Sequence, residues 1–327
     1  MAAYKKAKDT IRDNLQDTPT ADQLKEVSAG EKYAKHLPSK EEIKKIAWHI
    51  EKIMKVKVSD ALRNGEEGTK VILVQDLEKL LDGRVNQRLE RFARYPLVVE
   101  QLKQEETKGF EPVKHAPSYF DPSDGAVYMI TDNFEKIYKE KCEEKMIDAN
   151  SAEGKRFKKF LEFLYFAHEE IHKTIAEKNP AIRNSSSDRW AELAKVLEEH
   201  LDDENKTPEK EEKVVKSIES IRDKYDALDT CMEGIAHYAG YRVMCKLGYS
   251  SWASTEFGNI RNYTGTEPET PTYKEVMDAS KGIKFVEAIQ RRIHENPIAL
   301  IIEHPPTSMK YINNPDEYLK AREEGEI

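Results

Sequence analysis

The stretch EGKRFKKFLEFLYFAHEEIHKTIAEK, residues 153–178, decides the fold. Apolar residues recur along one side of it at helical spacing, which predicts an amphipathic helix that Pro180 closes. The members of this apolar side are Phe157, Leu161, Leu164, Ile171 and Ile175. His168 and His172 fall on the same side, so the helix is expected to turn two imidazoles toward the interior of the protein.

The segment His168-Glu169-Glu170-Ile171-His172 has the pattern HExxH. Residues four apart lie one turn apart on one helical face, so both imidazoles can reach one tetrahedral zinc ion at about 2.0–2.1 Å. Glu169 leans toward the same face and can take a proton from water without binding the metal. The alternative is a pair of core histidines bonded to backbone or carboxylate groups.

A zinc site of this kind needs a third protein ligand, and Glu233 is the best candidate. It lies in TCMEGIAHY, residues 230–238, where small neighbours such as Gly234 and Ala236 permit close packing of helices. HExxH followed by a helix bearing EGxA resembles the gluzincins, the thermolysin-like branch of zinc peptidases. The resemblance implies that His168, His172 and Glu233 bind zinc (Zn2+) and that Glu169 is the catalytic base.

Two further segments carry the resemblance. Residues 118–130, SYFDPSDGAVYMI, are similar to the strand that precedes the active-site helix in many zincins, whose edge pairs with an extended substrate. Residues 282–319 are similar to the end of a group of bacterial and archaeal HExxH proteins, with a helix bearing FV, then PPxS and P-x-x-Y-L. The resemblance covers roughly residues 115–320 and leaves out the N-terminal third.

The chain also departs from the gluzincin pattern. Many gluzincins have an acidic residue four positions after the ligand Glu, where this chain has His237. His237 could orient a ligand, donate to the transition state as a catalytic group, or be the third ligand itself. The long gap between His172 and Glu233 is expected to hold a two-helix insert at about 181–226. Candidate donors to an oxyanion are His237, His294, His304, Tyr263 and Tyr311.

The remaining patterns predict a mainly helical α+β protein with a zincin-like domain, a small sheet and an active-site helix. We expect a helical N-terminal region at 1–110 and the gluzincin-like domain at 111–327. A strand is expected at 126–130, with Val127–Met129 at the edge of the sheet, and residues 250–272 are expected to form a loop. Other helices are expected near 38–62, 74–94, 133–146, 188–203, 209–226, 228–246 and 273–295.

Composition and charge exclude several classes. The net charge of -8 does not favour nucleic acid or an anionic membrane as a partner. The longest apolar runs, such as Ile298–Ile302, are too short to cross a bilayer. Three cysteines without a paired spacing and an N-terminus without an apolar leader favour a cytoplasmic location. A di-iron carboxylate bundle needs a second Glu-x-x-His, and this chain has only Glu169…His172. The chain also has no Walker A loop and no dinucleotide-binding glycine pattern.

The function expected from these features is a zinc metallopeptidase, a hydrolase that cleaves a peptide or protein substrate. The alternative is a catalytically silent or latent zincin-fold protein that acts as a zinc-stabilised binding or scaffold module. Glu169 distinguishes the two, because a structural zinc site does not need a free carboxylate at that position. The sequence does not indicate the substrate or the oligomeric state.

Overall fold

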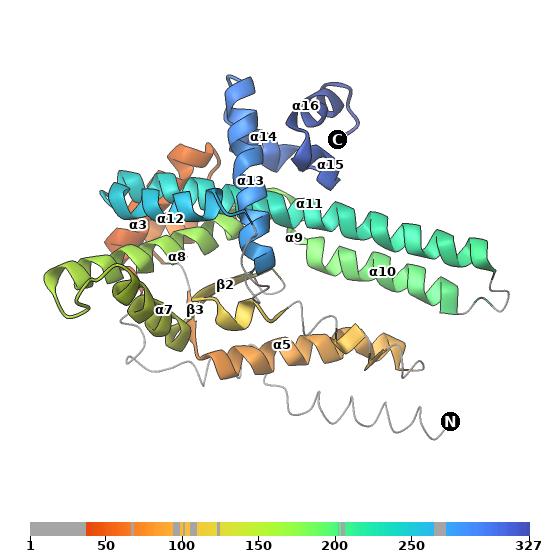
Figure 1. The fold of residues 1–327 in the computed structure, drawn as a ribbon, viewed down its shortest axis with the longest axis horizontal. Coiled ribbons are helices and arrows are strands. Elements are labelled where there is room, and N and C mark those ends of the chain that lie inside the picture. The colour runs from red at the N-terminus through yellow and green to blue at the C-terminus, as the bar shows by residue number, and fades with distance from the viewer. Residues whose placement is uncertain are drawn as a thin grey trace. The chain divides into compact units, whose positions relative to one another are not determined.

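The computed structural model describes residues 37–327 except 67–68, 94–98, 101, 105–109, 123–124, 202, 204–206 and 265–272. The described residues are mainly helical with one small sheet, which confirms the predicted mainly helical α+β class (Figure 1). Residues 1–36, the first part of the helical N-terminal region expected at 1–110, lie outside them. Across the described part of the chain, every helix is either too short or too polar to traverse a lipid bilayer.

The chain divides into two compact units. Among the described residues, the first holds Thr69–Tyr119 and Tyr128–Lys158, and the second holds Pro38–Gly68, Phe120–Val127 and Lys159–Ile327. Residues 38–68, which we placed in the N-terminal helical region, therefore group with the HExxH segment. All the predicted site residues belong to the second unit.

The first unit contains helices α5 and α7 beside two short strands. Strand β1 pairs in parallel with β3, with Lys70 opposite Tyr128 and Ile72 opposite Ile130. Its regular elements are β1 (Lys70–Ile72), α5 (Val74–Leu89), η2 (Glu90–Phe92), η3 (Val113–His115) and α7 (Thr131–Glu144). The predicted helices near 74–94 and 133–146 are thus confirmed within a few residues.

The sheet has the strand order β1-β3-β2, with β2 at Ser118–Asp121 and β3 at Ala126–Ile130. The strand predicted at 126–130 is confirmed, and all five of its residues are buried. Its placement at the sheet edge is wrong, because β3 lies between the two other strands. At three and four residues, β1 and β2 are too short to show the alternation that reveals a strand in a sequence.

Gly125, just before β3, is hydrogen-bonded to the last residue of β2. The backbone N–H of Gly125 donates to the carbonyl of Asp121 at 2.8 Å, and its φ of 68° is one that glycine adopts without strain. The buried side chains of Phe120 and Val127 then meet Ala176 in one apolar cluster. The end of the hairpin is thereby fixed to the helix that carries HExxH.

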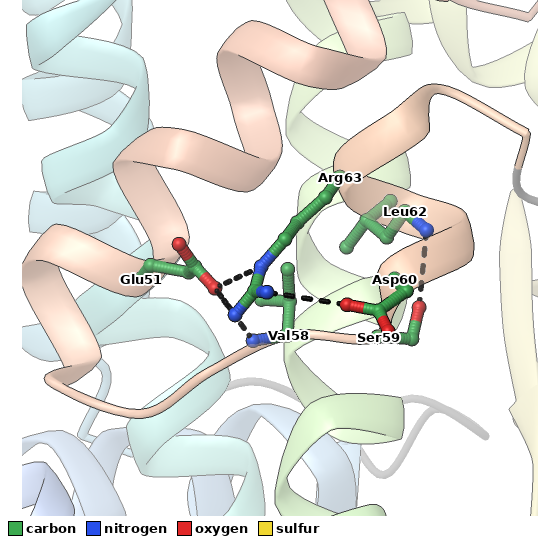
Figure 2. Close-up of polar contacts among 6 residues, drawn as sticks. All are labelled: Glu51, Val58, Ser59, Asp60, Leu62 and Arg63. Atoms are coloured by element: carbon green, nitrogen blue, oxygen red, sulfur yellow. Dashed lines mark hydrogen bonds and ion pairs between the residues drawn. The ribbon is translucent and has the colours of Figure 1, made fainter.

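The predicted helix at 38–62 is two helices, α3 (Lys40–Met54) and α4 (Asp60–Asn64). The predicted start of the first helix is correct. The Glu42 carboxylate accepts a hydrogen bond from the backbone N–H of Ser39 at 2.7 Å, which is part of a capping box at the N-terminus of α3. Helix α3 ends at Lys55, whose φ is 60°. Glu51 then accepts from Arg63 Nε at 2.7 Å and from the Val58 N–H at 3.1 Å (Figure 2). This half-buried ion pair fixes the bend between the helices.

The second unit is a set of helices around the long helix α11 (Pro208–Lys246). We expected two helices, 209–226 and 228–246, and this prediction is wrong. No glycine or proline lies between Pro208 and Gly234, and Tyr225, Ala227 and Leu228 are buried where the break was expected. Helix α10 (Ser185–Leu201) lies along the N-terminal half of α11 (Figure 1), joined by Glu192 to Lys224 at 2.7 Å.

Two glycines bring α11 and α13 (Tyr273–Arg292) into backbone contact. A Cβ on Gly234 would lie 2.2 Å from the carbonyl carbon of Gly282, and a Cβ on Gly282 would lie 2.0 Å from the carbonyl oxygen of Thr230. Only glycine fits on either side of such a crossing. This confirms the close helix packing expected around Glu233 and fixes the rotation of α11 at that residue.

Residues 250–261 form helix α12 (Ser250–Arg261), so the loop expected from residue 250 is wrong for this part. Its serines and Gly258 read as a loop in the sequence, yet Ala253 is buried and Trp252 lies 5.7 Å from the ring of Phe160. Tertiary packing therefore outweighs weak helix propensity here. The remaining helices are α8 (Ala152–Lys178), α9 (Pro180–Arg183), α14 (Pro297–Glu303), α15 (Met309–Asn313) and α16 (Pro315–Glu323).

Candidate metal site

Helix α8 presents the HExxH segment on a buried face. Phe166, Ala167 and Ile171 are fully buried around it, so the helix is held by apolar packing on the side that carries the histidines. The His172 side chain is 8% exposed and that of His168 is 16% exposed. The imidazoles therefore face inward, as their place on the apolar side of the helix predicts.

Glu233 on α11 meets both imidazoles. The Nε2 atoms of His168 and His172 are 3.0 Å apart. Glu233 Oε1 lies 3.3 Å from His172 Nε2, and Glu233 Oε2 lies 3.6 Å from His168 Nε2. Among the described residues, these three are the group whose ligand atoms all lie within 4.8 Å of one another.

These distances match the dimensions of a tetrahedral zinc site. Ligand atoms about 2.05 Å from a tetrahedral metal are about 3.3 Å from one another. The 3.0 Å between the two Nε2 atoms and the 3.3 Å from His172 Nε2 to Glu233 Oε1 are both close to that value. The 3.6 Å contact with His168 is made by the other carboxylate oxygen of Glu233, Oε2. The donor set of two imidazoles and one carboxylate is also a common one for catalytic zinc, with one coordination position left open.

Without a metal, the possible hydrogen bonds among these three side chains compete with one another. A neutral imidazole has one N–H. If His168 Nε2–H donates to His172 Nε2, that nitrogen accepts through its lone pair and has no hydrogen with which to donate to Glu233. If both Nε2 atoms carry hydrogen and donate to Glu233, two N–H groups face each other at 3.0 Å. A single cation at the centre accepts all three lone pairs at once.

The electrostatics of the group are coupled. Burial raises the pKa of the Glu233 carboxyl, but the charge of His172 and hydrogen bonds from His168 and His172 outweigh burial and hold that pKa well below its usual value. Burial lowers the pKa of His172, but the charge and hydrogen bond of Glu233 outweigh it and raise that pKa. Glu233 is thus ionised, ready to bind a cation, while a proton on His172 competes with that cation.

Glu169 is also buried, with 6% of its surface exposed. Its charge acts on His172 and contributes to the raised pKa of that imidazole. A buried carboxylate beside the imidazoles is what the sequence predicts for a base that acts next to the metal.

The other expected donors make contacts of a different kind. The carbonyl of His304 accepts a hydrogen bond from Tyr318, whose ring also lies 6.5 Å from Tyr311. The carbonyl of Tyr263 accepts from Ser280, and His294 is exposed. The structure does not bring these four into the described contacts of the metal-ligand group.

Asp229 is a charged residue near the site that the sequence analysis missed. It lies one turn before Glu233 on α11, and its charge contributes to raising the pKa of His172. Arg189 of α10 lies 3.6 Å from Asp229 and 3.8 Å from Asp226, so the predicted insert reaches the edge of the site. The sequence feature that could have identified Asp229 is its spacing of four residues from Glu233, which is one helical turn.

No protein-family model, curated protein or solved structure matches the chain. The resemblance to gluzincins therefore stays a prediction, and a proposal of function rests on the geometry of the three candidate ligands and Glu169.

Proposed function

We propose that the protein is a zinc-dependent peptidase in which His168, His172 and Glu233 bind the metal and Glu169 is the general base. The observation that carries the proposal is the close approach of these three side chains beside the buried carboxylate of Glu169. The two Nε2 atoms are 3.0 Å apart, and the carboxylate oxygens of Glu233 lie 3.3 Å from His172 Nε2 and 3.6 Å from His168 Nε2. The substrate class is a peptide or protein, as the HExxH arrangement implies.

Each residue has a distinct part in the reaction. His168 and His172 hold their positions on one face of α8, and Glu233 approaches from α11, which is fixed by its glycine crossing with α13. When bound, zinc supplies Lewis acidity, polarising a peptide carbonyl and lowering the pKa of water to about 7. Glu169 would take the proton of a water held at the site and would then deliver that proton to the leaving amine.

The charge of the site suits this chemistry. A zinc ion with two neutral imidazoles and ionised Glu233 has a net charge of about +1, which ionised Glu169 brings to about zero. Because Glu169 is buried, its charge is poorly screened by solvent and acts strongly on a nearby proton. The carboxylate that moves the proton is thus separate from the carboxylate that binds the metal.

The test is hydrolysis of a mixed peptide library by the zinc-loaded protein, followed by mass spectrometry of the products. We expect cleavage by the wild-type chain and a loss of about 10²–10⁴-fold in rate for Glu169→Gln, the range that general acid–base catalysis contributes. The variant should still bind zinc, since Glu169 is not a ligand. Glu177→Gln, an exposed position on the same helix, is the matched control and should cleave normally.

Two outcomes count against the proposal. Equal rates for the wild type and Glu169→Gln would show that Glu169 is not the base. Binding of one equivalent of zinc without cleavage of any peptide would favour the alternative, a zinc-stabilised binding module.

A further inference from the structure

His237 occupies the position one turn after Glu233 on α11, where its Nε2 lies 3.8 Å from Glu233 Oε2. Its ring centroid lies 4.5 Å from that of His168, with the ring planes tilted by 53°. The side chain is 26% exposed, so it lies between the ligands and solvent. It therefore touches two proposed ligands.

His237 is poorly placed to be a ligand. A tetrahedral fourth ligand atom must lie about 3.3 Å from each of the other three. The Nε2 of His237 is 3.8 Å from Glu233 Oε2, and His237 does not belong to the group whose ligand atoms all lie within 4.8 Å of one another. His237 is therefore a neighbour of the candidate ligands and not one of them.

The two oxygens of Glu233 have different neighbours. Oε1 lies nearest to His172, at 3.3 Å, whereas Oε2 lies between His168 at 3.6 Å and His237 at 3.8 Å. A hydrogen bond to one oxygen of a ligating carboxylate leaves the other to bind the metal and fixes its orientation. A shift of under about 1 Å brings His237 within hydrogen-bond distance of Oε2.

From this geometry we infer that His237 is a positioning residue whose N–H holds Oε2 of Glu233, so that Glu233 binds the metal through one oxygen and a coordination position stays open for water. The inference rests on the proposed function and extends it. It gives an imidazole the task of orienting the carboxylate ligand from its own helix, one turn away. Packing of the His237 ring on His168 is secondary to this hydrogen bond.

Four variants of the full chain separate these contributions. His237→Ala removes both the ring and the N–H, His237→Phe keeps a ring without a donor, and His237→Gln keeps a donor without the ring. His294→Ala removes an exposed imidazole and is the matched control. Zinc affinity is measured by competition with a chelator. X-ray absorption gives the number of imidazoles on the bound zinc, and circular dichroism shows whether each variant is folded.

We expect a loss of about 10–100-fold in zinc affinity for His237→Ala and His237→Phe, the usual effect of removing a group that orients a ligand. His237→Gln should recover most of the affinity, and the imidazole count should be two in the wild type and in every variant. A count of three in the wild type that falls to two in His237→Ala would make His237 a ligand and overturn the inference.

Other results bear on the inference and on the proposed function separately. The inference would be overturned if His237→Phe bound zinc with wild-type affinity, or if His237→Gln and His237→Ala lost zinc affinity equally. Neither result would contradict the proposed zinc peptidase. Absence of zinc from the wild-type protein would overturn the proposed function itself.

Discussion

The crossing of α11 and α13 makes Gly234→Ala a sharp test of how Glu233 is positioned. The new Cβ would lie 2.2 Å from the carbonyl carbon and 2.4 Å from the Cα of Gly282, whereas ordinary contacts begin at 3.4 Å. The obstacle is backbone, which cannot rotate away as a flexible side chain does. The two helices must therefore separate by about 1.2 Å at this point.

The cost follows from this displacement. Overpacking of a tight interior costs about 1–3 kcal/mol, and a backbone obstacle places this substitution near the upper end. Replacing glycine by alanine inside a helix returns about 1 kcal/mol. The net loss is then about 2 kcal/mol, or roughly 4–8 °C in Tm. A shift of this size also exceeds the tolerance of about 0.2 Å on metal–ligand distances, so zinc affinity should fall as well.

The assay is thermal unfolding with and without zinc, together with zinc affinity by chelator competition. Gly240→Ala is the matched control, because it lies on the same helix and its Cβ would meet nothing within 4 Å. We expect it to leave zinc affinity unchanged and to stabilise the protein by up to about 1 kcal/mol. If Gly234→Ala matched the control in both measurements, the glycine crossing would not position Glu233.

Three further outcomes follow from the charges. Since a proton on His172 competes with the metal, zinc affinity should fall as pH drops through the raised pKa of His172, by about tenfold per unit, and an affinity independent of pH would contradict this. Without metal, the raised His172 pKa stabilises the fold below pH 6.5, and this effect is lost as pH rises through the folded pKa. The lowered Glu233 pKa stabilises the fold above pH 4.5, and this effect is lost as pH falls through the folded pKa. Thermal melts of the apoprotein should therefore show the full contribution of both groups between pH 4.5 and 6.5, and a smaller contribution in His172→Asn, where only His168 still lowers the Glu233 pKa. Arg63→Met, which removes the contacts to Glu51, should cost about 1 kcal/mol in urea unfolding, and no loss would show that the bend does not depend on this pair.

The sequence predicted those parts of the site that depend on local periodicity. Helical spacing places His168 and His172 on one face, and apolar neighbours such as Ile171 predict that this face is buried. The small residues after Glu233 predicted close packing, since Gly234 is where α11 meets α13. The burial of the histidine-bearing face and the close packing around Glu233 were therefore predictable without a structure.

The misses arose where non-local contacts decide the structure. Strand β1 depends on parallel pairing with β3, which residues 70–72 alone do not indicate. Helix α12 depends on packing such as that of Trp252 against Phe160. The position of Asp229 beside His172 depends on how α8 and α11 pack together, and a one-dimensional pattern does not show this.

The most direct test of the central claim is the zinc content of the purified protein and of His172→Ala, measured by mass spectrometry of the metal after saturation and removal of loosely bound ions. We predict one equivalent in the wild type and almost none in the variant, which loses one of three ligands. No zinc in the wild type, or equal zinc in both proteins, would contradict a site built by His168, His172 and Glu233.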